Sequence, residues 1–187
     1  MDTFRWITVV VSTILGLGIA RLLTSSVVLF HSRNRAKLDW VPMAWALAVF
    51  VQQIGFWWSL EELSSLVPKW TLAGFLLLVG LVLALFLSAA LILPSTEIHG
   101  DDRLSDFFEE DGRYALLALA GYNLFAILAN WVFWKQSILT RSGFENLALA
   151  ALAGVAFAAP RRPRVAATLT YVPLIVLLLA RESPASY

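Results

Sequence analysis

Long apolar runs recur along this chain, and they restrict it to one class of fold. The clearest are residues 4–30 and 70–93. A helix needs about 20 mainly apolar residues to cross the hydrocarbon layer of a bilayer. Charged residues make up only 14% of the sequence, which is too small a share to cover the surface of a soluble domain. We therefore expect an all-α integral membrane protein.

Six transmembrane helices are predicted within one polytopic membrane domain, residues 1–187. They cover residues 4–30, 39–60, 70–93, 114–134, 144–159 and 165–180. The last two are short for a hydrocarbon layer about 30 Å thick that a helix crosses at about 1.5 Å per residue. A re-entrant hairpin is therefore the alternative for these two. Pro173 is expected to kink the last helix, because proline removes a backbone hydrogen bond.

The positions of the basic residues predict how the helices are oriented. Eight Lys and Arg residues fall in the loops after the first, third and fifth predicted helices, and five fall on the opposite side. Basic residues favour the cytoplasmic side, which predicts an inner-membrane protein with both termini outside. Six of the eight Trp residues fall at helix ends that face the termini, as interfacial anchoring requires. They are Trp6, Trp57, Trp58, Trp70, Trp131 and Trp134.

Composition and motifs argue against several classes of function. A net charge of +1 gives no electrostatic basis for nucleic-acid binding, and a chain without cysteine has no thiolate ligand or nucleophile. His31 and His99 both lie outside the predicted helices. A zinc site that joins them to Glu97 and Asp101 is conceivable, but loop histidines without helical spacing do not predict one. We expect no enzyme, no cofactor and no metal site.

One sizeable polar segment interrupts the apolar pattern, at residues 95–113. Seven acidic residues against two arginines give it a net charge of −5. Leu104, Phe107 and Phe108 follow the i, i+3, i+4 spacing of a narrow apolar stripe on a helix. We expect a short acidic amphipathic helix on the cytoplasmic side. A solvated acidic loop is the alternative.

Basic residues are expected to hold this acidic helix, because anionic lipid headgroups repel it. The two other loops on the same side supply them. We call the resulting hypothesis the cytoplasmic latch. Its acidic members are Asp106, Glu109 and Glu110, and its basic members are Arg33, Arg35, Arg161, Arg162 and Arg164.

Small residues recur every four positions on two predicted helices, a spacing that lets another helix backbone approach closely. The first stripe is Ser12, Gly16, Ala20 and Thr24, and the second is Ala150, Gly154 and Ala158. We expect both stripes to serve helix packing within the chain. Contact with a second copy or with another membrane protein is the alternative.

Arg21 lies well inside the first predicted helix, where a cation costs about 2.5–3.5 kcal/mol on insertion scales. Something has to pair or hydrate its guanidinium group. Polar residues on the second and fourth helices are candidates, and with Arg21 they define what we call the polar lane. The lane comprises Arg21, Gln52, Tyr122, Asn123 and Asn130.

Two interpretations of this lane remain open. In the first, its side chains converge on a water-filled pathway in which Arg21 binds an anion. Gln52 also begins a polar stripe that continues through Gly55, Ser59 and Glu62 on the second helix. In the second, Arg21 bonds to neighbouring amides and backbone carbonyls and only locks helices together.

The first interpretation predicts a small channel or passive transport module, assembled as a homo-oligomer in the lipid bilayer. An alternative is a non-catalytic accessory or scaffold subunit that binds a membrane-protein partner. A further alternative is a membrane sensor gated by the acidic cytoplasmic helix.

Overall fold

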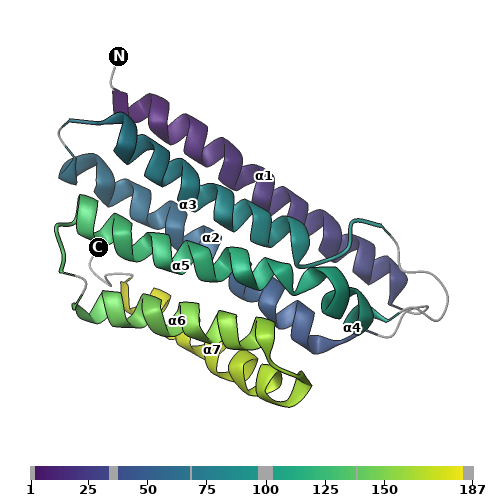
Figure 1. The fold of residues 1–187 in the computed structure, drawn as a ribbon. Coiled ribbons are helices and arrows are strands. Elements are labelled where there is room, and N and C mark those ends of the chain that lie inside the picture. The colour runs from purple at the N-terminus through teal and green to yellow at the C-terminus, as the bar shows by residue number, and fades with distance from the viewer. Residues whose placement is uncertain (1–2, 34–37, 68, 97–102, 138, 183–187) are drawn as a thin grey trace.

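The computed structural model describes residues 3–33, 38–67, 69–96, 103–137 and 139–182. Within these ranges the chain is a succession of helices joined by short connections (Figure 1). They are α1 (Thr3–Ser32), α2 (Trp40–Leu66), α3 (Leu72–Leu91), α4 (Leu104–Phe107), the π-helix η1 (Phe108–Gly112), α5 (Tyr114–Phe133), α6 (Arg141–Ala158) and α7 (Arg161–Glu182).

Local sequence explains where several of these helices begin and end. The side chain of Asp39 caps the first turn of α2, and that of Thr71 caps the first turn of α3. Each accepts a hydrogen bond from an N–H group that has no partner within its own helix. The α3 helix ends at Leu91, shortly before Pro94, which has no N–H group to continue it.

The six long helices form an up-and-down bundle. In Figure 1, α1, α3, α5 and α6 lie side by side in that order, and α2 and α7 lie behind them. The start of α1 and the end of α7 lie at the same end of the bundle. We call this the terminal end, and we call the other end, which carries α4 and η1, the loop end.

Five of the described helices are long and apolar enough to cross a membrane. The five segments are Phe4–Ser32, Trp40–Leu63, Leu72–Leu91, Tyr114–Phe133 and Arg161–Arg181. The α6 helix is not among them, because Arg141, Glu145 and Asn146 make its first two turns polar. A helical membrane protein is compatible with this structure, but the predicted count of six spans is not confirmed.

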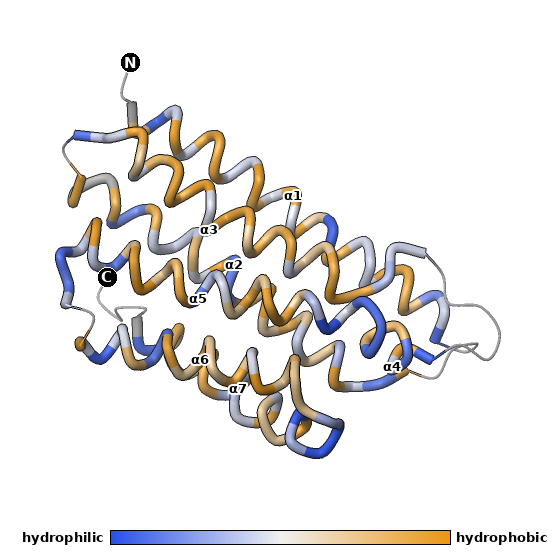
Figure 2. Tube along the Cα trace, in the orientation of Figure 1, coloured by the Kyte–Doolittle hydropathy of each residue, from blue (hydrophilic) through white to orange (hydrophobic). Residues whose placement is uncertain are grey.

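Apolar side chains cover the outside of the bundle as well as its core. Figure 2 shows hydrophobic residues along the lengths of the helices and most hydrophilic residues near the two ends. Large aliphatic side chains on four different helices point outward, among them Leu17, Leu76, Leu124 and Leu177. Such a surface suits a lipid environment rather than water.

The small-residue stripe of α1 does not pack inside the chain, which differs from our expectation. Gly16, Ala20 and Thr24 are exposed, and a Cβ atom added to Gly16 would meet no atom within 4 Å. Ser12 is half-buried. The stripe of α6 is divided, since Ala150 is buried, Gly154 is half-buried and Ala158 is exposed. A repeat of small residues favours close packing, but only the neighbouring helices decide whether a partner is present.

The polar segment forms the short helices α4 and η1, and residues 97–102 lie outside the described residues. Leu104 and Phe108 are buried against the bundle core, and Phe107 packs at its edge. Glu109 and Glu110 are exposed. The segment is therefore amphipathic in the described part, as its spacing predicts.

Candidate functional site

A cavity of about 340 Å³ opens at the terminal end of the bundle, between α2, α5, α6 and α7. Its walls include the rings of Phe56, Trp58 and Trp134. Polar side chains of α2, α5, α6 and the α5–α6 connection also line it, whereas α7 contributes apolar side chains. The polar residues are Gln52, Ser59, Glu62, Tyr122, Asn130, Gln136, Ser142, Glu145 and Asn146. A partly enclosed cavity with aromatic walls and several convergent polar groups is the usual form of a small-molecule site.

A chain of buried amides lies at the inner end of this cavity. The Nε2 group of Gln52 donates to Asn123 Oδ1 at 3.2 Å. Asn123 in turn directs its Nδ2 group toward Leu119 O at 2.8 Å and Tyr171 Oη at 3.3 Å. Asn123 and Tyr171 have no exposed surface, and Gln52 is only 5% exposed. These bonds join α2, α5 and α7 at the centre of the bundle.

Two aromatic rings pack together in the core next to these amides, toward the loop end of the bundle. The rings of Trp45 and Tyr171 lie 4.6 Å apart between centroids, at an angle of 50°. Both side chains are fully buried, and so is Val49, which lies one turn after Trp45 on α2. We call Trp45 and Tyr171 the aromatic plug.

A second, smaller cavity of about 200 Å³ lies at the loop end, on the other side of the plug. Here Arg161 pairs with Asp39 at 3.2 Å, and Arg164 pairs with Glu109. The same helices, α2 and α7, line both cavities. From Pro42 in this cavity to Val51 in the larger one, α2 rises roughly 14 Å.

Arg164 is almost completely buried, and its bonds explain why. Its Nε group donates to Ala156 O at 2.9 Å, and its Nη2 group donates to Ala159 O at 3.0 Å. In a continuing helix, Ala156 O would accept from the residue four positions later, but that residue is Pro160. Arg164 supplies the missing donor and also contacts Glu109 of η1.

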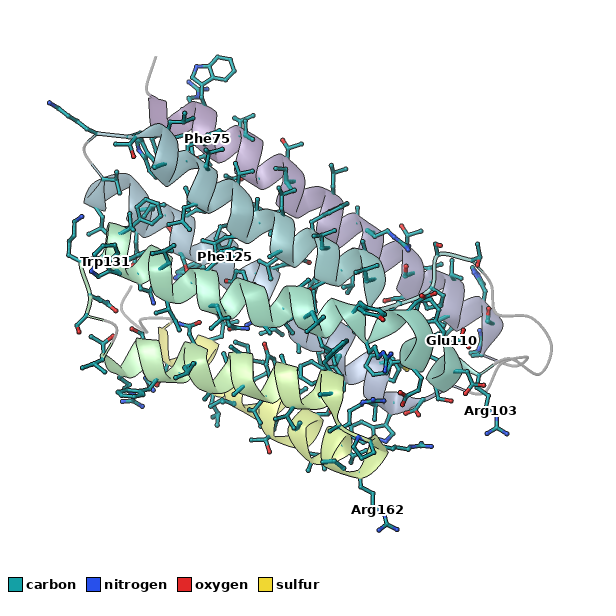
Figure 3. All side chains as sticks on the ribbon, in the orientation of Figure 1. Phe75, Arg103, Glu110, Phe125, Trp131 and Arg162 are labelled. Atoms are coloured by element: carbon teal, nitrogen blue, oxygen red, sulfur yellow. The ribbon has the colours of Figure 1, made fainter. Side chains whose placement is uncertain are left out.

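The described residues bring together only part of the predicted cytoplasmic latch. Arg164 and Glu109 pair as the hypothesis requires, whereas Arg161 pairs with Asp39 at the start of α2. Other members point elsewhere, and Arg35 lies outside the described residues. Arg33 stacks over the Phe30 ring, Asp106 accepts from Ser105, and Glu110 and Arg162 are exposed. Figure 3 shows Arg162 extending away from the bundle.

Arg21 does not line the cavity, among the residues that the structure describes. Its guanidinium donates to Ser25 on its own helix and to Ala90 O, 3.3 Å away, in the last turn of α3. The residue four positions after Ala90 is Pro94, which has no N–H group to offer. Arg21 therefore completes the end of α3, where helix carbonyls also favour a cation.

We expect Arg21→Leu to lower the free energy of unfolding by about 1–2 kcal/mol, because Ala90 O loses a charged hydrogen-bond donor. In a flux assay of the predicted channel, we expect Arg21→Leu to behave as the original protein does, because Arg21 does not line the cavity. Thermal unfolding in detergent and flux in proteoliposomes measure the two quantities. Arg21→Lys, which keeps a donor, serves as the control. A change in flux larger than the change with Arg21→Lys would contradict this placement.

Of the polar lane, the structure joins Gln52, Tyr122 and Asn130 in one cavity and links Asn123 to Gln52. Sequence reasoning did not select Tyr171, Glu145 or Asn146. The last two stand one turn inside α6, where a polar pair ahead of an apolar run was a usable signal. Tyr171 had no such signal, because a tyrosine in an apolar helix is as compatible with lipid contact as with a core bond.

Within the described ranges, no three His, Asp or Glu side chains form a group able to hold a metal ion. One carboxylate that lines the cavity is instead bonded to two arginines. Glu145 accepts from Arg141 at 2.8 Å and from Arg181 at 3.2 Å.

No family model, curated protein or solved structure matches this chain.

Proposed function

We propose that this protein is a passive transport module for a small solute, with a route through α2, α5, α6 and α7. The observation that carries the proposal is the polar cavity, which ends at the buried chain Gln52–Asn123–Tyr171. Polar groups inside a membrane bundle are costly and in most cases functional. The second cavity lies beyond the aromatic plug, so the arrangement corresponds to a closed state.

This function requires α6 to cross the bilayer as a sixth span beside the five apolar helices. Its polar first turns then face the cavity rather than lipid, since Ser142, Glu145 and Asn146 are among the lining residues. In this arrangement both termini lie on the side of the inner membrane opposite the cytoplasm, and the larger cavity opens toward that side. The loop end, with its Arg161–Asp39 and Arg164–Glu109 pairs, then faces the cytoplasm.

The test is solute flux into proteoliposomes, with one variant that fills the cavity. Ser59 lines the cavity and donates to Gly55 O one turn earlier. We expect Ser59→Phe to lower the flux at least about tenfold, which is a barrier increase of about 1.4 kcal/mol. Stopped-flow light scattering with a panel of neutral, cationic and anionic small solutes measures it.

Ser26→Phe is a matched control for this variant. Ser26 makes the same kind of bond, to Leu22 O one turn earlier, but it lines an outer groove between α1 and α2. Its replacement should leave the flux unchanged. Equal flux in the two variants and the original protein, or no flux above that of empty liposomes, would overturn the proposal.

An accessory or scaffold subunit is the second candidate function, and one observation favours it. Gly16, Ala20 and Thr24 leave a small-residue stripe on the outside of α1 that no other part of the described chain covers. A helix of a second copy or of a partner protein can approach such a stripe closely. Absence of flux from well-folded protein favours this candidate, and a homo-oligomer is compatible with both.

A further inference from the structure

We infer that the outer groove between α1 and α2 binds an anionic phospholipid. One acyl chain of the lipid lies in the groove, and its phosphate accepts hydrogen bonds from Arg33 at the polar end. We call this surface the α1–α2 groove. It is separate from the proposed transport route, because none of its lining residues lines the polar cavity.

The α1–α2 groove has a volume of about 370 Å³ and an almost wholly apolar lining. Its walls include the large side chains of Leu23 and Phe30, which are both more than half exposed. Among the described lining residues, Ser26 is the only polar one besides Arg33, and its hydroxyl donates to Leu22 O at 2.9 Å. An exposed apolar hollow of this kind suits a hydrocarbon chain.

The length of the groove matches one leaflet of a bilayer. Along α1 the lining residues run from Leu22 to Arg33, a rise of about 16 Å. Half of a hydrocarbon layer about 30 Å thick is about 15 Å. Arg33 directly follows α1 at the loop end of the bundle (Figure 1). The groove therefore reaches from that end to about the middle of the bilayer.

The start of α2 gives an independent indication of where the headgroups lie. Trp40, the first residue of α2, is 47% exposed. Tryptophan concentrates at the interface between lipid and water. Because Trp40 and Arg33 flank the same connection between α1 and α2, Arg33 lies near the level of the lipid phosphates.

Arg33 supplies a cation whose charge no described carboxylate balances. None of the ion pairs between described residues includes it. Its Nη1 group donates to Phe30 O at 2.8 Å, and its guanidinium carbon lies 4.0 Å from the centre of the Phe30 ring. Asp39, which follows the lining residue Leu38, is already paired with Arg161.

The guanidinium group of Arg33 thus lies at the rim of the groove with further N–H donors for a ligand. An arginine has five such donors, and it binds a phosphate group through two of them at once. A zwitterionic headgroup also carries an ammonium group, but none of the described lining residues is acidic. A headgroup with a net negative charge therefore fits the rim best.

A helix of another protein fits the groove less well than a lipid. Close approach of a second helix requires small residues, whereas Leu23, Phe30 and Leu47 make the walls bulky. The small-residue stripe of α1 is a different surface, since Gly16 and Thr24 do not line the groove. A flexible acyl chain can follow a narrow hollow between large side chains.

Binding of phosphatidylglycerol to the purified, delipidated protein in a non-ionic detergent tests the inference. Phosphatidylcholine with the same acyl chains has no net charge, and glycerol 3-phosphate has the anionic phosphate without the chains. Native mass spectrometry, in a titration with each probe, measures the dissociation constant of the first molecule bound. We expect phosphatidylglycerol to bind at least about fivefold more tightly than phosphatidylcholine. Glycerol 3-phosphate should bind at least about tenfold more weakly than either lipid, because it buries no methylene groups.

Arg33→Gln tests the headgroup contact. It should reduce the preference for phosphatidylglycerol over phosphatidylcholine to less than about twofold, because it removes the charge at the rim. Arg162→Gln is the matched control, since Arg162 is also exposed but extends from α7 and does not line the groove (Figure 3). This control should keep the preference of the original protein.

Leu23→Ala tests the acyl-chain contact. It should weaken the binding of both lipids about threefold and leave the preference between them unchanged, because it removes apolar contact area from one wall. Leu17→Ala is the control, since Leu17 is a similarly exposed leucine of α1 that does not line the groove. Both leucines are more than half exposed, so neither replacement opens a hole in the core.

Equal affinity for the two lipids, or the same loss of preference in Arg33→Gln and Arg162→Gln, would overturn the anionic-lipid site. Equal weakening by Leu23→Ala and Leu17→Ala would overturn its placement in the groove. If glycerol 3-phosphate binds as tightly as phosphatidylglycerol, Arg33 binds a free phosphate ester and the occupant is not a lipid. These results do not depend on transport, because binding is measured without flux and away from the proposed route.

Discussion

Replacement of Trp45 by alanine is expected to lower the free energy of unfolding by about 3–5 kcal/mol, the usual range for a buried tryptophan. Trp45 is fully buried, and its ring packs on that of Tyr171 at a centroid distance of 4.6 Å. Thermal unfolding in detergent should therefore show a large decrease in Tm.

The same replacement should increase solute flux at least about tenfold, if the two cavities are parts of one route. Trp45 and Tyr171 form the aromatic plug, and Asn123 links Tyr171 to Gln52, which lines the larger cavity. Proteoliposome flux measures the effect. Unchanged flux in a folded Trp45→Ala protein would show that the plug is not a barrier to transport.

Trp131→Ala is the matched control for both measurements. Trp131 is 56% exposed at the terminal end of α5, where Figure 3 labels it. Its loss removes an interfacial anchor but leaves the core intact. We expect a much smaller decrease in Tm and no increase in flux.

Replacement of Arg164 by alanine is expected to lower the free energy of unfolding by about 3 kcal/mol. The variant removes two charge-assisted hydrogen bonds to backbone carbonyls, each worth about 1.5 kcal/mol or more. Ala156 O is the more costly loss, because Pro160 has no N–H group that could replace the guanidinium. The ion pair with Glu109 adds little, since that carboxylate is 48% exposed.

Arg162→Ala provides the control, because Arg162 is an exposed neighbour on the same helix. Its effect should stay within about 0.5 kcal/mol. Hydrogen exchange adds a local measurement: amides of η1 and of the last turn of α6 should exchange faster in Arg164→Ala only. If Glu109→Gln alone accelerates η1 to the same degree, the ion pair holds the segment, as the sensor hypothesis requires.

Much of the helix pattern was predictable from hydropathy alone. The predicted segments 4–30, 70–93 and 114–134 agree closely with α1, α3 and α5. The predicted end of α2 at residue 60 was too early, because Glu61 and Glu62 interrupt an apolar run without interrupting the helix. Similarly, α7 begins at Arg161 rather than at residue 165, since a basic first turn is polar but still helical.

The candidate site was only partly predictable. Gln52, Tyr122 and Asn130 line one cavity, and Gln52 bonds to Asn123. Asn123 and Asn130 lie two turns apart on α5 and so share a face, but the meeting of Gln52 with α5 depends on how the helices pack. Arg21 was grouped with these residues by its distance along the chain from one end of α1. That distance does not determine direction around the helix or which neighbour lies there, and the guanidinium faces α3 instead.

The sequence by itself determined that this chain forms long apolar helices joined by polar connections. The reason is that burial in lipid depends on the composition of a segment of about twenty residues. The sequence also contained the two prolines that leave Ala90 and Ala156 without helical donors. Only the tertiary structure decided which side chains meet. Arg21 and Arg164 reach those carbonyls, and the small residues of α1 face outward. The physical reason is that helix rotation and neighbour choice depend on packing between segments distant in sequence, which no local pattern encodes.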